Sequence, residues 1–121
     1  METSSRSAST SEPTNWLVKD DVVLASAEVA GTRRLRARGL LGREGIDGVL
    51  VLPRVRSVHT IGMRFPIDVA FCDRDGVVIR SLTMSPGRVS RPVWRARWVV
   101  EAEAGAMRHW GIEVGERLEL R

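Results

Sequence analysis

Residues 57–76, SVHTIGMRFPIDVAFCDRDG, decide the fold of this chain. From position 67 to position 72 the side chains alternate: Ile67, Val69 and Phe71 point one way, and Asp68, Ala70 and Cys72 the other. A period of two residues predicts a β-strand, entered at Pro66. The turn residues 73–76, DRDG, predict a hairpin whose return arm covers residues 77–84. Asp68 stands out as a carboxylate among small, covered neighbours.

Eight further segments carry strand or helix signals. Short apolar runs predict strands at residues 16–18, 22–25, 48–53, 57–63, 98–101 and 117–120, the last with Leu118 and Leu120 inward. In the 57–63 strand, His59 would share a face with Ile61 and Met63, and Thr60 would point the opposite way. Glycine-terminated segments predict two short helices, residues 32–42 and 104–110. These elements together predict a mostly β, β-rich α+β fold: a single-domain β-sandwich or distorted barrel with two short helices.

The size and composition of the chain fit one domain with an ordinary core. The chain has 121 residues and is 43% hydrophobic. Residues 1–14 are rich in Ser and Thr and are expected to form a disordered tail, which leaves residues 15–121 as the folded domain. Cys72 is the only cysteine, so the sequence predicts neither an internal disulfide nor a cysteine zinc site, and no cofactor. No apolar run is long enough to cross a bilayer, and no signal-peptide core is present, so we expect a soluble, cytoplasmic protein.

The positive charge is almost entirely arginine. The formal net charge is +4, the pI is about 10.8, and Lys19 is the only lysine. A loop predicted at residues 85–96 carries three arginines and Trp94, a combination that can contact nucleic acid through phosphates and stacking. No recognised nucleic-acid motif accompanies it, and excess arginine also follows from genomic base composition. The sequence alone therefore does not favour a nucleic-acid partner.

A set of short motifs, in this order and spacing, resembles the DUF192 family, also called UPF0127, of uncharacterised prokaryotic proteins. The motifs are RGLLGR (38–43), FPIDVAF (65–71) with DGVV (75–78), MSP (84–86), WVVE (98–101) with AG (104–105), and GIEVGE (111–116). The resemblance implies a mostly β, sandwich-like fold with short helices and no established activity. It also implies a possible link to envelope or pilus assembly, because some relatives accompany such genes. The family commonly has Phe-Trp-Met-Lys-Asn-Thr where this chain has VHTIGM (58–63), so a function of that Lys and Asn would be lost or altered here.

The candidate site combines five residues, Arg38, His59, Thr60, Met63 and Asp68. The leading hypothesis is a non-enzymatic module that uses this face to bind a small ligand or a protein partner. The rival is a small enzyme in which Asp68 and His59 perform acid/base chemistry. A third interpretation makes Asp68 structural, paired with an arginine such as Arg38 or capping backbone amides. Neither a nucleophile-elbow context nor a metal-ligand cluster is present, so no catalytic residue is assigned.

Overall fold

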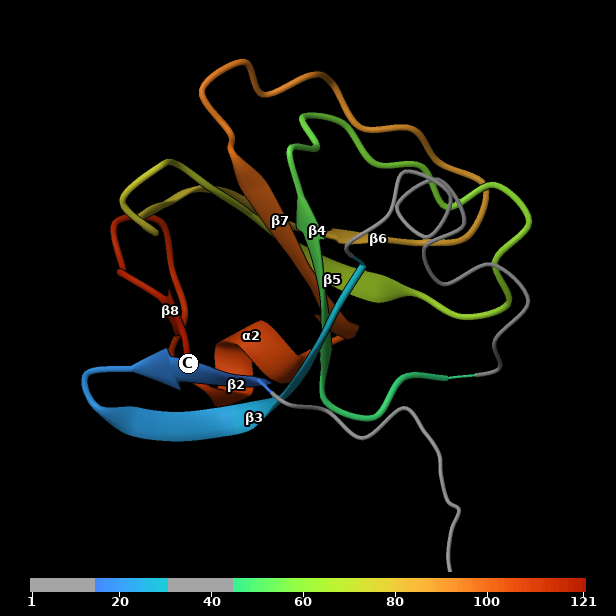
Figure 1. Ribbon diagram of the computed structural model, residues 1–121. Helices are drawn as coiled ribbons and strands as arrows, with labels where there is room; N and C mark the ends of the chain where they lie inside the picture. Colours follow the sequence, from blue (N-terminus) through green and yellow to red (C-terminus); the bar gives the residue numbers. More distant parts are fainter. Residues whose placement is uncertain (1–14, 31–44) are drawn as a thin grey trace, which may run out of the picture.

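The computed structural model describes residues 15–30 and 45–121 as a strongly curled β-sheet with one short helix (Figure 1). The elements of the described residues are β2 (Asn15–Lys19), β3 (Val22–Val29), β4 (Val49–Pro53), β5 (Ile67–Cys72), β6 (Val78–Met84), β7 (Trp98–Glu103), α2 (Ala106–His109) and β8 (Glu119–Leu120). The mostly β prediction is confirmed, and the architecture is a seven-stranded half-barrel. The predicted tail (1–14) and the predicted helix at residues 32–42 lie outside the described residues. No helix of the described part is long and apolar enough to cross a membrane.

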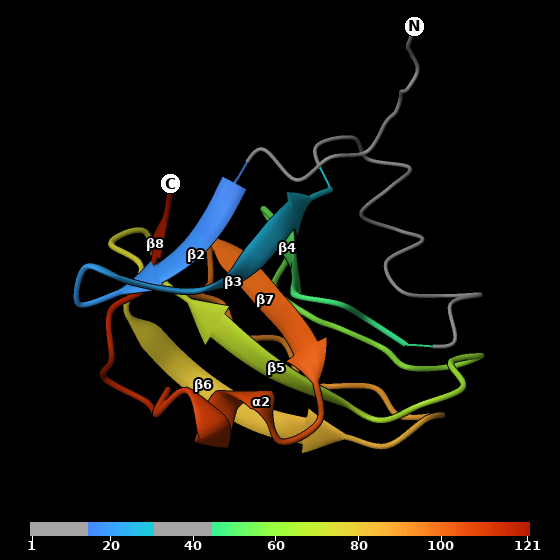
Figure 2. The ribbon, with the colours of Figure 1, turned by 90° about the horizontal axis from the view of Figure 1, so that it is seen from below.

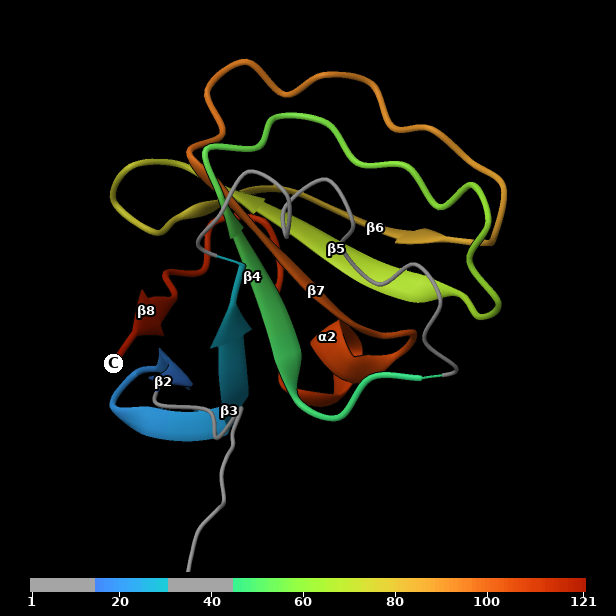
Figure 3. The same ribbon diagram turned by 45° about the vertical axis from the view of Figure 1, so that its right-hand side comes forward.

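The strand order is β6-β5-β7-β4-β3-β2-β8, and every pair is antiparallel except β3 with β4. The sheet curls until the segment before β8 reaches the start of β6 (Figure 3). There the Val78 amide donates to the Glu116 carbonyl at 2.8 Å, and the Leu118 amide donates to the Gly76 carbonyl at 2.8 Å. These bonds satisfy backbone groups that an open sheet would leave at its edges, which is the usual reason for a sheet to close.

Both faces of the central strands are buried, as the alternation in β5 predicts. All six β5 residues are buried. Ile67, Val69 and Phe71 belong to one core cluster, and Ala70 and Cys72 belong to the other. The second cluster includes Met107 of α2, which packs below the sheet (Figure 2). The side chains of β5 therefore divide between two cores, and Asp68 shares the α2 side.

The predicted β5–β6 hairpin is confirmed and depends on one glycine. Gly76 adopts φ +85°, and a Cβ there would lie 2.2 Å from the Leu118 carbonyl oxygen. Asp73 Oδ1 accepts hydrogen bonds from the amides of Asp75 at 2.9 Å and Val77 at 3.0 Å, which fixes the turn. Only glycine fits both this backbone conformation and this close approach.

Two details of the sequence-based prediction are wrong. Residues 57–63 form a loop with one isolated bridge, His59 to Val89, and no strand. Gly62 at φ +84° and a hydrogen bond from the Met63 amide to the Thr60 carbonyl at 3.1 Å form a tight turn, so Ile61 is 55% exposed while Met63 is buried. At the C-terminus only Leu118 points inward, because Leu120 is 37% exposed.

Candidate functional site

Asp68 anchors helix α2 to the sheet. Its side chain is 4% exposed, and Oδ1 accepts a hydrogen bond of 2.6 Å from the Thr83 hydroxyl. Oδ2 accepts hydrogen bonds from the backbone amides of Gly105 at 2.9 Å and Met107 at 3.1 Å. Gly105 is the N-cap of α2 and has no side chain to cap it, so a carboxylate from β5 takes that role. The prediction that Asp68 is covered and held by backbone amides or an arginine is confirmed, with the amides as partners.

Thr60 is fully buried and joins two loops. Its hydroxyl donates to the Ser85 carbonyl at 2.6 Å and accepts from the Arg88 amide at 2.9 Å. Its carbonyl accepts a hydrogen bond from the Gly87 amide at 2.9 Å. The Thr60 hydroxyl therefore acts as both donor and acceptor inside the fold, and because it is buried it is not presented to a ligand.

The two loops, residues 54–66 and 85–97, run side by side, and we call them the paired loops (Figures 1 and 3). The first connects the end of β4 to the start of β5, and the second connects the end of β6 to the start of β7. The end of β4 lies beside the start of β7, and the end of β6 lies beside the start of β5. Both loops therefore connect the same two ends of the sheet. Backbone hydrogen bonds of 2.7–2.8 Å join them in four rows, Arg54–Arg97, Arg56–Val93, Val58–Ser90 and Thr60–Arg88.

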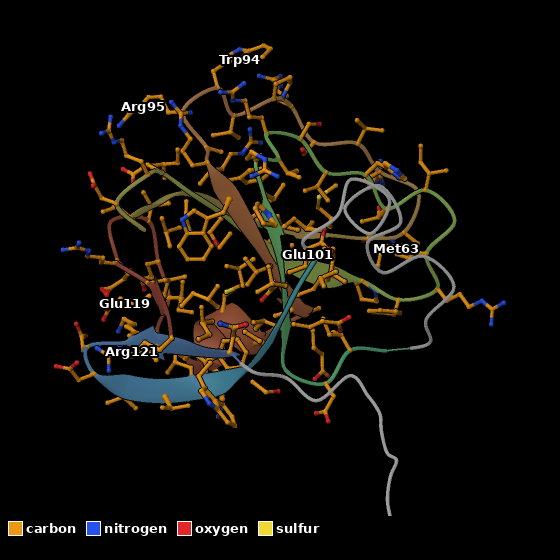
Figure 4. All side chains as sticks on the ribbon, viewed as in Figure 1. Met63, Trp94, Arg95, Glu101, Glu119 and Arg121 are labelled. Atoms are coloured by element: carbon orange, nitrogen blue, oxygen red, sulfur yellow. The ribbon has the colours of Figure 1, made fainter. Side chains whose placement is uncertain are left out.

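The outer surface of the paired loops is strongly basic, and we call it the basic face. The loops carry seven exposed arginines and no Asp or Glu: Arg54, Arg56, Arg64, Arg88, Arg91, Arg95 and Arg97. Elsewhere the described residues hold six basic and twelve acidic side chains, so the charge is separated along the molecule. Trp94 is 73% exposed and projects outward with Arg95 at this end of the molecule (Figure 4). The structure gives no ion pair between Arg56, Arg88, Arg91 or Arg95 and any of residues 15–30 and 45–121.

The four described residues of the predicted site lie in different surroundings. Arg38 lies outside the described residues. His59 is exposed on the paired loops, and its Nδ1 accepts a hydrogen bond from the Ile61 amide at 3.3 Å. Met63 is buried against the core beneath the same loop (Figure 4), while Asp68 faces α2. No hydrogen bond joins Asp68 to His59, so the two do not form a proton relay in this arrangement.

Sequence reasoning missed a second buried carboxylate. Glu101, on β7, is 4% exposed and lies in register between Leu50 and Val69, two core residues (Figure 4). The sequence signal was available, because Val99 and Glu101 share a face of a predicted strand. A carboxylate in such apolar surroundings requires compensating charge or hydrogen bonds. We therefore assign Glu101 a structural role in this core.

Cys72 is buried on the α2 side of β5 and is not a reactive thiol. Burial raises the pKa of the Cys72 thiol to about 12, and the neighbouring Asp73 carboxylate adds to the shift. The thiol is therefore neutral at physiological pH, and the thiolate is the nucleophilic form. Among the described residues, no group of three or more His, Cys, Asp or Glu side chains is placed to hold a metal ion.

The family profile of DUF192, described as "Uncharacterized ACR", matches residues 16–120, nearly the whole described chain. The chain belongs to the DUF192 family. UPF0127 proteins of Pyrococcus furiosus and Pyrococcus abyssi are 36% and 32% identical over 63 residues, 52% of this chain. That stretch is 54% of each archaeal protein, so the chain spans about half the length of the curated relatives it matches. The DUF192 identification made from the ordered motifs is thereby confirmed.

Two solved structures share the DUF192 fold seen here. One is a protein of unknown function from Novosphingobium aromaticivorans, with a TM-score of 0.72, 17% identity, and coverage of 87% of this chain and 82% of that one. The other is titled a putative transcription regulator from Sinorhizobium meliloti, with a TM-score of 0.70, 24% identity, and coverage of 87% and 90%. At these identities the likeness concerns the fold alone.

Proposed function

We propose that this DUF192 protein is a non-catalytic binding module in the cytoplasm and that the basic face of its paired loops is the contact surface. One observation carries the proposal: seven exposed arginines on two hydrogen-bonded loops, with no carboxylate among them. Like charges gathered on two neighbouring loops repel one another, so an anionic partner that neutralises them gains binding free energy. Arginine also presents planar, bidentate donors that match carboxylate and phosphate groups.

The geometry of the other candidate residues supports binding over catalysis. Asp68 already accepts three hydrogen bonds, from Thr83, Gly105 and Met107, and is only 4% exposed, so it is poorly presented to a reactant from solvent. Thr60 and the buried Met63 shape the paired loops from below. In this proposal they act as supports, while His59 stands beside the arginines on the exposed side. A module of this kind acts as an adaptor, a role that also fits the expected link to envelope or pilus assembly.

The test is native mass spectrometry of the protein purified at low salt from its source organism. The loop variant Arg91→Glu/Arg95→Glu should lose a partner molecule that the wild type retains. The control is Arg108→Glu, which changes an exposed arginine of α2, outside the basic face. This control should keep the partner. A partner held equally well by the loop variant and the wild type would refute the proposal.

A further inference from the structure

We propose that the anionic partner of the basic face is a single-stranded nucleic acid, bound without base specificity; this inference rests on the proposed function above. The sequence shows one basic loop with three arginines, Trp94 and no known motif. The structure places a second loop, with Arg54, Arg56 and Arg64, directly beside it. The two neighbouring loops together carry seven exposed arginines, instead of the three on the single predicted loop.

The shape of the basic face suits a linear polyanion. The four hydrogen-bonded rows run from Arg54–Arg97 to Thr60–Arg88, six residues along the first loop, or about 20 Å at the rise of an extended chain. The rows keep the loops side by side over this length, and we take the exposed arginines that both loops carry along it as one stripe. A stripe of this length covers about four nucleotides, the lower end of the site sizes of known single-strand-binding domains.

Trp94 favours a single strand over a duplex. Its indole is 73% exposed, and Arg91 and Arg95 are its neighbours on the same loop. A large aromatic ring held in water beside cations is a stacking platform for an unpaired base, whereas the bases of a duplex already stack on each other. Stacking does not depend on base identity, which is why we expect little sequence preference.

A protein partner or a membrane fits the basic face less well. The exposed apolar side chains of the face, Ile61, Val89 and Trp94, are interspersed with arginines. Protein interfaces instead have a contiguous apolar centre from which charges are depleted. A membrane surface is broad, and a narrow stripe uses little of it, whereas successive phosphates of a single strand follow the stripe.

The experiment measures fluorescence anisotropy of a labelled twelve-nucleotide oligo(dT) with the full chain. We expect binding whose log K falls with log salt at a slope of about −3, for roughly four phosphates neutralised. Arg91→Glu/Arg95→Glu should weaken binding at least tenfold and reduce the slope by about 1.4, since two phosphate contacts are lost. Trp94→Ala should weaken binding by about five- to a hundredfold without changing the slope, because stacking involves no counterions. Arg108→Glu, with the same charge change per residue as each loop substitution, should stay within about twofold of the wild type.

Three comparisons decide the identity of the partner. A twelve-base-pair duplex should bind more weakly than oligo(dT) and should not respond to Trp94→Ala. If vesicles of phosphatidylserine or a poly-glutamate chain bind tightly and oligo(dT) does not, the nucleic-acid inference is wrong. In that case loss of the host partner from the Arg91→Glu/Arg95→Glu variant would still support the proposed function. If oligo(dT) binds equally well to wild type and to the loop variant, the inference is wrong as well, because the contact lies elsewhere.

Discussion

Replacing Asp68 should detach α2 from the sheet and lower the free energy of unfolding. In Asp68→Ala the buried Met107 amide and the half-covered Gly105 amide lose their acceptor, while Thr83, which is exposed, can turn to water. One buried and one partly buried unsatisfied donor, with the lost charge-assisted bonds, correspond to about 3 kcal/mol. For a chain of this size that lowers the Tm by about 10 °C.

Asp68→Asn removes the negative charge of the side chain and keeps its shape. The amide oxygen can still accept from Gly105 and Met107, and the amide nitrogen can donate to the Thr83 hydroxyl, so the loss should be about 1 kcal/mol. Thr83→Val, which removes only the bond to Oδ1, should cost less than about 1 kcal/mol. Urea unfolding of the three variants, followed by circular dichroism, measures these values. Wild-type stability in Asp68→Ala would refute the anchoring role, and equal losses in Asn and Ala would show that the charge, not the acceptor, holds α2.

Three further measurements test other parts of the fold. The folded pKa of Cys72 is raised to about 12, so the folded thiol keeps its proton where the unfolded thiol loses it, and this contribution to stability should decline from about pH 9 to pH 12. Between pH 8 and 10.5 the wild type should therefore lose more stability than Cys72→Ala, and parallel losses would contradict the assignment. Gly76→Ala should cost about 3 kcal/mol or more, because its Cβ would meet the Leu118 carbonyl, whereas Gly87→Ala, at φ +82° in open space, should cost about 1–2 kcal/mol; similar Tm values for the two variants would show that the close approach is not tight. Deleting residues 1–14 should leave the Tm within about 2 °C, since a Ser/Thr-rich segment buries little apolar surface, and a larger drop would show that this segment is docked.

Local sequence patterns predict the central strands of this fold well, because strand alternation and turn formation depend on residues that are close together in the sequence. The alternation of residues 67–72 and the DRDG turn place β5 and its hairpin, and the continuous apolar run at residues 49–52 predicts the doubly covered β4. The same approach fails at residues 57–63, where alternating residues form a loop. The turn at Gly62 breaks the alternation, and hydrogen bonds to the second loop replace a regular ladder. A period of two cannot distinguish these cases, since an extended loop also points successive side chains to opposite sides.

The candidate site was less predictable because it depends on strand order. Asp68 and Thr60 attract attention in the sequence as polar residues in apolar surroundings, and such residues are the ones a fold must satisfy internally. Both are indeed engaged inside, with α2 and with the second loop. Arginines look like ordinary solvated side chains in the sequence, because residues 67–84 separate the two loops that carry them. The loops come together only because β4 pairs with β7 and β5 with β6, which places the two loops side by side in opposite directions. The exposed arginines of the paired loops, which remain available to a partner, are therefore the residues that no local sequence pattern brings together.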